Sequence, residues 1–145
     1  MQKINVVCVG KIKEEFFRDA TAEYLKRLSR FAKVEVKELA EGKDLEEEAQ
    51  SIFRAAKGYV IALCVEGVKL SSEKMASHVK TLYDKGSEIT FIIGSSFGLS
   101  NAVKDKADLK LSFSDMTFPH QLMRVILLEQ IYRAFMINSG STYHK

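Results

Sequence analysis

The stretch Tyr59–Ile93 reads YVIALCVEGVKLSSEKMASHVKTLYDKGSEITFII, and it decides the fold class. Its two ends, Tyr59–Val65 and Ile89–Ile93, are almost continuously apolar, which is typical of parallel strands buried on both faces. We interpret Glu66–Leu70 as a loop, after which Ser71 can cap a helix. Apolar residues at helical spacing predict the inward face of that helix: Met75, Val79, Leu82 and Tyr83.

The alternation of strand and helix continues on both sides of this unit. Further strands are predicted at Ile4–Val9, Val34–Leu39 and Leu109–Phe113. Apolar stripes and capping residues predict further helices at about 17–31, 45–56, 101–107 and 119–138, with Asp44 and Glu47 forming a capping box before the second of these. Five strands alternating with five helices predict one domain, residues 1–145, with a three-layer α/β architecture and a mostly parallel sheet.

The composition is that of an ordinary soluble globular protein. The 145 residues are 46% hydrophobic and 28% charged, which excludes disordered, collagen-like and coiled-coil chains. The net charge of +3 is compatible with nucleic acid, but a DNA-reading module usually carries a stronger basic stripe, so no DNA is expected. We recognise no secretory signal and no run near the roughly 18 apolar residues of a membrane span, so we expect a cytoplasmic protein that binds no membrane. Cys8 and Cys64 lie in apolar runs without metal-ligand spacing, which predicts reduced core thiols and no metal site.

The last predicted helix is apolar around almost its whole circumference. Such a helix must be buried on all sides, which favours contact with a second copy of the chain. The alternative is a central helix covered by its own chain. Glu129 and Arg133 are spaced as i, i+4 ion-pair partners.

Ligands of open α/β sheets bind outside the carboxyl ends of the strands. Three such ends contain small or polar residues: Leu63–Gly67, Gly94–Gly98 and Phe113–Phe118. None of them has the glycine pattern of a dinucleotide-binding or phosphate-binding loop. From the residues alone, we therefore expect an α/β dimer that binds a small ligand, with its function open.

Several segments together resemble a known family. They are SFSDMTFPHQLMRV (Ser112–Val125), LEQIYRAF (Leu128–Phe135) and the terminal YHK, with INVVCVGKIK (Ile4–Lys13), LCVEGVKLSSE (Leu63–Glu73) and FIIGSSFGL (Phe91–Leu99). In this order they resemble the SPOUT-class methyltransferases that methylate N3 of a pseudouridine in large-subunit (23S) ribosomal RNA, the ribosomal RNA large subunit methyltransferase H family. The resemblance covers the whole chain.

The resemblance implies a C-terminal trefoil knot, a homodimer built on the knot helices, and S-adenosyl-L-methionine as the cofactor. The implied substrate is large-subunit ribosomal RNA or the assembled ribosome. The implied cofactor contacts are Leu63, Gly94, Phe113, Ser114, Asp115, Met116, Thr117 and Phe118. Two departures are visible. The family usually has two glycines after the buried strand and this chain has Gly94 followed by Ser95, and the stretch around Ala40 to Asp44 is shorter than in many relatives.

Methyl transfer to an imide nitrogen calls for a base, or for a cation that stabilises the anion. The candidates are His120, Arg124, Arg133, Tyr143 and His144, with Glu129 beside them. His120 has an alternative role as a residue that shapes the cofactor loop. Two non-catalytic alternatives are a ribosome-assembly RNA-binding module and a flavodoxin-like nucleotide-binding regulatory domain, although the second would need a phosphate loop that the sequence lacks. A basic face at Lys26, Arg27, Arg30 and Lys33 would contact RNA near Arg124, Arg133 and Lys145 of the other subunit.

Overall fold

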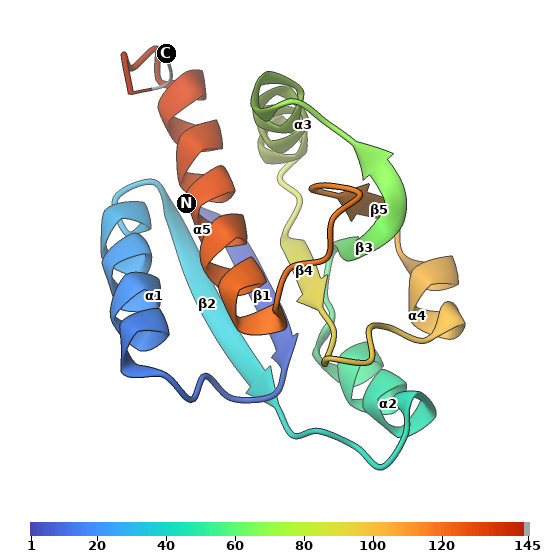
Figure 1. The fold of residues 1–145 in the computed structure, drawn as a ribbon. Coiled ribbons are helices and arrows are strands. Elements are labelled where there is room, and N and C mark those ends of the chain that lie inside the picture. Colours follow the sequence, from blue (N-terminus) through green and yellow to red (C-terminus); the bar gives the residue numbers. More distant parts are fainter. Residues whose placement is uncertain (144–145) are drawn as a thin grey trace.

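Five strands and five helices alternate along residues 1–143, the part of the chain that this computed structural model describes (Figure 1). The order is β1 (Gln2–Val9), α1 (Glu15–Leu28), β2 (Ala32–Leu39), α2 (Leu45–Ala55), β3 (Tyr59–Lys69), α3 (Ser72–Asp84), β4 (Ile89–Ile93), α4 (Asn101–Lys106), β5 (Leu109–Ser112) and α5 (His120–Asn138). The number and order of the predicted elements are confirmed.

The five strands form one sheet in the order β2-β1-β4-β3-β5, and every neighbouring pair is parallel. α5 packs between α1 and α3 on one face of the sheet, and α2 packs with α4 on the other (Figure 1). The predicted three-layer α/β architecture is therefore confirmed. The trefoil knot stays a prediction from the resemblance.

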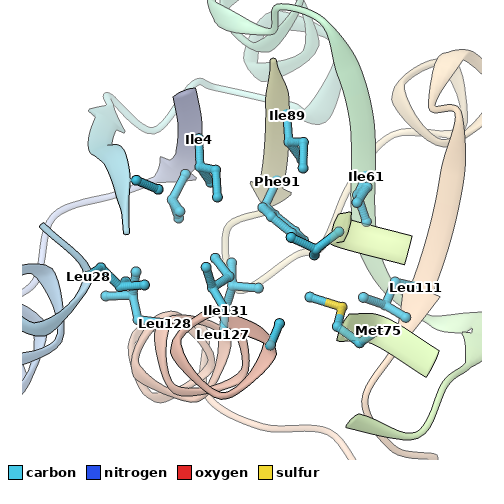
Figure 2. Close-up of a cluster of buried hydrophobic side chains, with 14 of the residues drawn as sticks. Ile4, Leu28, Ile61, Met75, Ile89, Phe91, Leu111, Leu127, Leu128 and Ile131 are labelled. Atoms are coloured by element: carbon cyan, nitrogen blue, oxygen red, sulfur yellow. The ribbon is translucent and has the colours of Figure 1, made fainter. Parts of the chain in front are cut away.

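The larger part of the core lies between the sheet and α5. Figure 2 shows Leu127 and Ile131 of α5 directed toward the sheet, where Phe91 lies, and Leu128 beside Leu28 of α1. All five side chains are fully buried. A smaller cluster on the opposite face joins residues of β1, β3 and β4 to α2 and α4. The near-continuous apolar character of β1 and β4 follows from burial on both faces.

Side-chain caps fix the beginnings of three helices. The Asp44 carboxylate accepts a hydrogen bond from Glu47 N at 2.8 Å, which orients α2 directly behind the carboxyl end of β2. Ser71 caps α3, as predicted from the sequence, and Ser100 caps α4 in the same way. Because each of these helices begins just after a loop from a strand end, the caps also help to hold those loops.

The interpretation of Glu66–Leu70 as a loop is wrong, because β3 continues to Lys69. The pairing of β3 with β5 shifts between Leu63 and Val68, so that the intervening residues bulge away from β5. Gly67 permits the return, since a Cβ there would lie 2.6 Å from the Lys110 carbonyl carbon. β3 is also less buried than predicted, because Val65 in this bulge is 46% exposed.

Two aromatic residues also lie outside their predicted places. Tyr83 is 53% exposed, because in the last turn of α3 it points 100° away from buried Leu82. Phe31 lies beyond the end of α1 at Leu28, and its ring stacks on Phe135 of α5 at 5.7 Å.

α5 is the central helix of its layer. Its fully covered face carries Arg124, Leu127, Leu128, Ile131 and Ala134. On the opposite side lies an outer stripe of half-buried residues, which we define as Leu122, Val125, Glu129, Arg133 and Met136. The chain's own α1 and α3 thus cover much of the apolar circumference. The alternative of a central helix covered by its own chain accounts for most of the apolar pattern.

Candidate functional site

A pocket of about 530 Å³ opens at the carboxyl ends of β3, β4 and β5. Seven of the residues that the resemblance assigns to cofactor binding line it: Leu63, Gly94, Phe113, Ser114, Met116, Thr117 and Phe118. These residues come from the three strand ends that sequence reasoning selected. The parallel sheet brings the strand ends together because all five strands end at the same edge.

Asp115 is the exception among the predicted cofactor residues. It is absent from the pocket lining, and its carboxylate forms an ion pair with Lys69 of β3. The Asp115 side chain is 83% exposed and the Lys69 side chain 53% exposed. The structure therefore directs this carboxylate into solvent rather than into the pocket.

The turn after β4 forms one wall of the pocket. A Cβ at Gly94 would lie 2.4 Å from the Gly98 carbonyl oxygen, so only glycine fits there. Ser95, where the family usually has glycine, is accommodated without strain, because no residue other than glycine has a positive φ within residues 1–143. Its hydroxyl donates to the carboxylate of Glu48 on α2 at 3.1 Å.

Sequence reasoning missed an ion pair at the pocket wall. Lys104 Nζ of α4 lies 2.5 Å from Glu66 Oε1 of β3, and both residues line the pocket. The hydrogen bond from Lys104 holds the pKa of Glu66 below its usual value. The only sequence signal was the position of Glu66 after an apolar run, because the residues are 38 positions apart in the sequence.

His120 is the first residue of α5 and lines the pocket. It faces Gly10 at the carboxyl end of β1, where an added Cβ would lie 3.8 Å from His120 Nε2 and 3.2 Å from Glu41 Oε1. Of the four catalytic candidates within residues 1–143, His120 is the one that lines the pocket.

Arg124 does not line the pocket, although it follows His120 by one helical turn. Its side chain is 1% exposed, with Nη1 2.5 Å from Glu38 Oε2 and Nη2 donating to the Gly10 carbonyl at 3.1 Å. Glu38 Oε2 also accepts from Ile12 N at 3.0 Å. Arg124 therefore ties α5 to the carboxyl ends of β1 and β2, which also removes it from the predicted RNA-contacting face.

Arg133 and Tyr143 both lie at Glu129, on the outer side of α5. Glu129 Oε2 accepts from Arg133 Nε at 2.8 Å, which confirms the i, i+4 pair. Glu129 Oε1 accepts from the Tyr143 hydroxyl at 2.7 Å and from the Tyr24 hydroxyl at 3.2 Å. The hydrogen bond to Glu129 raises the pKa of Tyr143 above its ordinary value. His144 and Lys145 lie outside the described residues.

Residues 1–143 contain neither a metal-binding cluster nor a membrane-spanning helix. No group of three or more His, Cys, Asp or Glu side chains in this range could hold a metal ion. None of the helices described is both long and apolar enough to cross a membrane.

Comparison with known proteins identifies the family. A sequence model described as "Predicted SPOUT methyltransferase" matches residues 2–144. The chain belongs to the SPOUT methyltransferase family. Members named "Ribosomal RNA large subunit methyltransferase H" are 50% identical in Lactobacillus acidophilus and 49% identical in Lactobacillus helveticus, each over 98% of this chain and 99% of the relative.

Solved structures agree with this SPOUT assignment at the level of the fold. A methylase-family protein from Neisseria gonorrhoeae superposes with a TM-score of 0.60 at 9% identity, over 99% of this chain and 87% of that one. The SpoU methyltransferase AviRb from Streptomyces viridochromogenes, solved with the cofactor AdoMet, gives 0.53 at 10% identity, over 93% of this chain and 58% of that one.

Proposed function

We propose that this protein binds S-adenosyl-L-methionine in the pocket and methylates N3 of a pseudouridine in large-subunit ribosomal RNA. The observation that carries the proposal is the pocket itself, in which three separate loops converge at one edge of the sheet. The names of the relatives at about half identity support the RNA substrate. A ribosomal substrate also supports the cytoplasmic location expected from the sequence.

The residues present fit a nucleoside-bearing cofactor. The volume of about 530 Å³ lies within the roughly 300–1,000 Å³ of small-molecule sites. Leu63, Leu111 and Phe113 supply apolar walls for a flat ring. The bare backbone at Gly94 allows close approach by a ligand, and its peptide groups can donate or accept hydrogen bonds.

When bound, the cofactor supplies a methyl group on a positively charged sulfur. The chain's own task is to align the acceptor nitrogen and to exclude water. We assign removal of the imide proton to His120, because its ring lines the pocket at the amino end of α5. The exposed residues Lys26, Arg30 and Lys33 are assigned to contacts with RNA phosphates.

A homodimer through the outer stripe of α5 is part of this proposal. Leu122, Val125 and Met136 are apolar and only half-buried in the single chain. Tyr143 is held at Glu129, nine residues along α5 from His120, which is about 13 Å of helix. This separation supports a tail that acts on the pocket of the other subunit.

The first experiment measures S-adenosylhomocysteine binding by calorimetry and methyl transfer to three substrates: naked 23S RNA, 50S subunits and 70S ribosomes. Saturable binding with methylation at one pseudouridine N3, mapped by mass spectrometry, is expected. RNA binding without cofactor binding would replace the proposal with the non-catalytic assembly module.

The second experiment tests the dimer and the direction of the tail. Val125→Asp should yield monomers by sedimentation, whereas Ile131→Asp should unfold the chain because Ile131 is 0% exposed. A heterodimer of one subunit lacking residues 143–145 and one Gly94→Val subunit should regain one working site. An inactive heterodimer, with both parent homodimers folded, would show that the tail acts within its own subunit.

A further inference from the structure

Glu48 is a buried carboxylate outside the pocket. It lies in the first turns of α2 with only 6% of its surface exposed. Its Oε1 accepts from the Ser95 hydroxyl at 3.1 Å, and its Oε2 accepts from Gly42 N at 3.1 Å. Both oxygens of a buried carboxylate are thus used to connect two loops rather than to pair with a cation.

Ser95 is the residue through which Glu48 reaches the pocket. The Ser95 carbonyl accepts from Gly98 N at 2.8 Å, and the Ser95 hydroxyl oxygen accepts from Phe97 N at 3.3 Å. A hydroxyl has one proton, so donation to Glu48 points its lone pairs toward the Phe97 amide. The orientation of the Ser95 side chain therefore depends on the Glu48 carboxylate.

The turn at residues 94–98, which Ser95 holds, also forms one wall of the pocket. Gly94 lies so close to Gly98 that a Cβ would approach the carbonyl oxygen to 2.4 Å, and both glycines line the pocket. A small shift of this turn would change the width of the cofactor slot. The hydrogen bond from Ser95 to Glu48 of α2 opposes that shift, and Ser95 is the position where this chain replaces the family's usual glycine.

We propose that Glu48 is a positioning residue for cofactor binding, which acts through the Ser95 hydroxyl to hold the 94–98 turn against the pocket. The inference rests on the proposed cofactor. Glu47 provides a matched control, because its exposed side chain lies on the same helical turn. If Glu48 only stabilised α2, its loss would lower the melting temperature without changing the affinity of the folded protein.

The experiment is a double-mutant cycle on the full chain, with S-adenosylhomocysteine as the calorimetric probe. Glu48→Ala and Ser95→Ala should each raise Kd about tenfold, the size expected for losing a hydrogen bond to a charged group. The double variant should bind no more weakly than the single variant with the higher Kd, because both changes remove the same Ser95–Glu48 hydrogen bond. Glu48→Gln keeps one acceptor oxygen for the Ser95 hydroxyl but sets its amide NH2 against Gly42 N, so its Kd should lie between those of wild type and Glu48→Ala. Glu47→Ala should bind like wild type.

Hydrogen exchange supplies a readout that needs no ligand. The Phe97 amide should exchange faster in Glu48→Ala and in Ser95→Ala, whereas amides in the β1 core should not change. Wild-type affinity in folded Glu48→Ala, or Kd changes that multiply in the double variant, would overturn the inference. If Glu48→Ala does not fold, Ser95→Ala and Glu48→Gln test the inference instead. A wild-type Kd together with a wild-type exchange rate of the Phe97 amide in Ser95→Ala would refute the inference. Failure of the wild type to bind the probe would instead refute the proposed cofactor.

Discussion

Replacing Arg124 with Met tests whether this residue is structural. Methionine fills much of the same volume but removes the guanidinium that binds Glu38 at 2.5 Å and the Gly10 carbonyl at 3.1 Å. The Gly10 carbonyl then loses its buried donor. The Glu38 carboxylate then keeps the hydrogen bond from Ile12 N and the nearby positive charge of Lys11.

The expected loss of unfolding free energy is about 2–3 kcal/mol. Breaking a fully buried ion pair costs roughly 3–5 kcal/mol, because it leaves an uncompensated charge. The Arg124 side chain is 1% exposed, but that of Glu38 is 35% exposed, so water can solvate the remaining carboxylate. This partial exposure places the cost below the range for a fully buried pair.

The pH dependence gives a second test of the same pair. Burial alone would raise the pKa of Glu38, but the hydrogen bonds from Arg124 and from Ile12 N outweigh it and hold the pKa below its ordinary value. A carboxylate whose pKa is lowered in the folded state stabilises the protein at pH values above its unfolded-state pKa. This stabilisation is lost as the pH falls through the folded-state pKa. The difference between wild type and Arg124→Met should therefore be largest near neutral pH and shrink in acid.

Urea denaturation at fixed protein concentration measures this difference, since the stability of the proposed dimer would depend on concentration. Arg54→Met, at an exposed arginine of α2, is the control and should change stability by less than about 0.5 kcal/mol. S-adenosylhomocysteine affinity should persist in the folded variant. A loss below about 0.5 kcal/mol for Arg124→Met, or a difference that does not shrink in acid, would refute the structural assignment.

Three further outcomes are expected. Gly94→Ala should abolish calorimetric binding of S-adenosylhomocysteine while preserving the far-ultraviolet circular dichroism. The reason is that the alanine Cβ would approach the Gly98 carbonyl oxygen to 2.4 Å. Unchanged affinity would place the cofactor elsewhere. Glu129→Gln should lower the pKa of Tyr143, because the negative charge that disfavours the tyrosinate is removed. Ultraviolet titration reports this pKa, since the protein has 5 tyrosines and no tryptophan. An unchanged titration curve would contradict the contact between Tyr143 and Glu129. Burial raises the pKa of the Cys8 thiol to about 11, so iodoacetamide should modify Cys8 only after the protein unfolds. Rapid labelling of Cys8 in the native protein, mapped by mass spectrometry, would contradict its burial.

Much of the local structure could be predicted because it depends on near neighbours. Asp44, Ser71 and Ser100 cap helices through bonds to amides three residues away, so their roles are visible in the sequence. The apolar runs at β1 and β4 identify buried strands for the same reason. Strand ends also follow from these runs, which is why the pocket loops could be selected before the fold was known.

The sequence by itself determined the α/β class, the order of the elements and, through the resemblance, seven of the residues that line the pocket. Only the tertiary structure decided what the polar side chains do. Arg124 meets Glu38 and Glu48 meets Ser95 across separations of 86 and 47 residues, which no local pattern encodes. Asp115 turns outward to Lys69 because β3 continues past its predicted end. Backbone periodicity is a short-range property, whereas the burial and pairing of a charge depend on which strands become neighbours in the sheet.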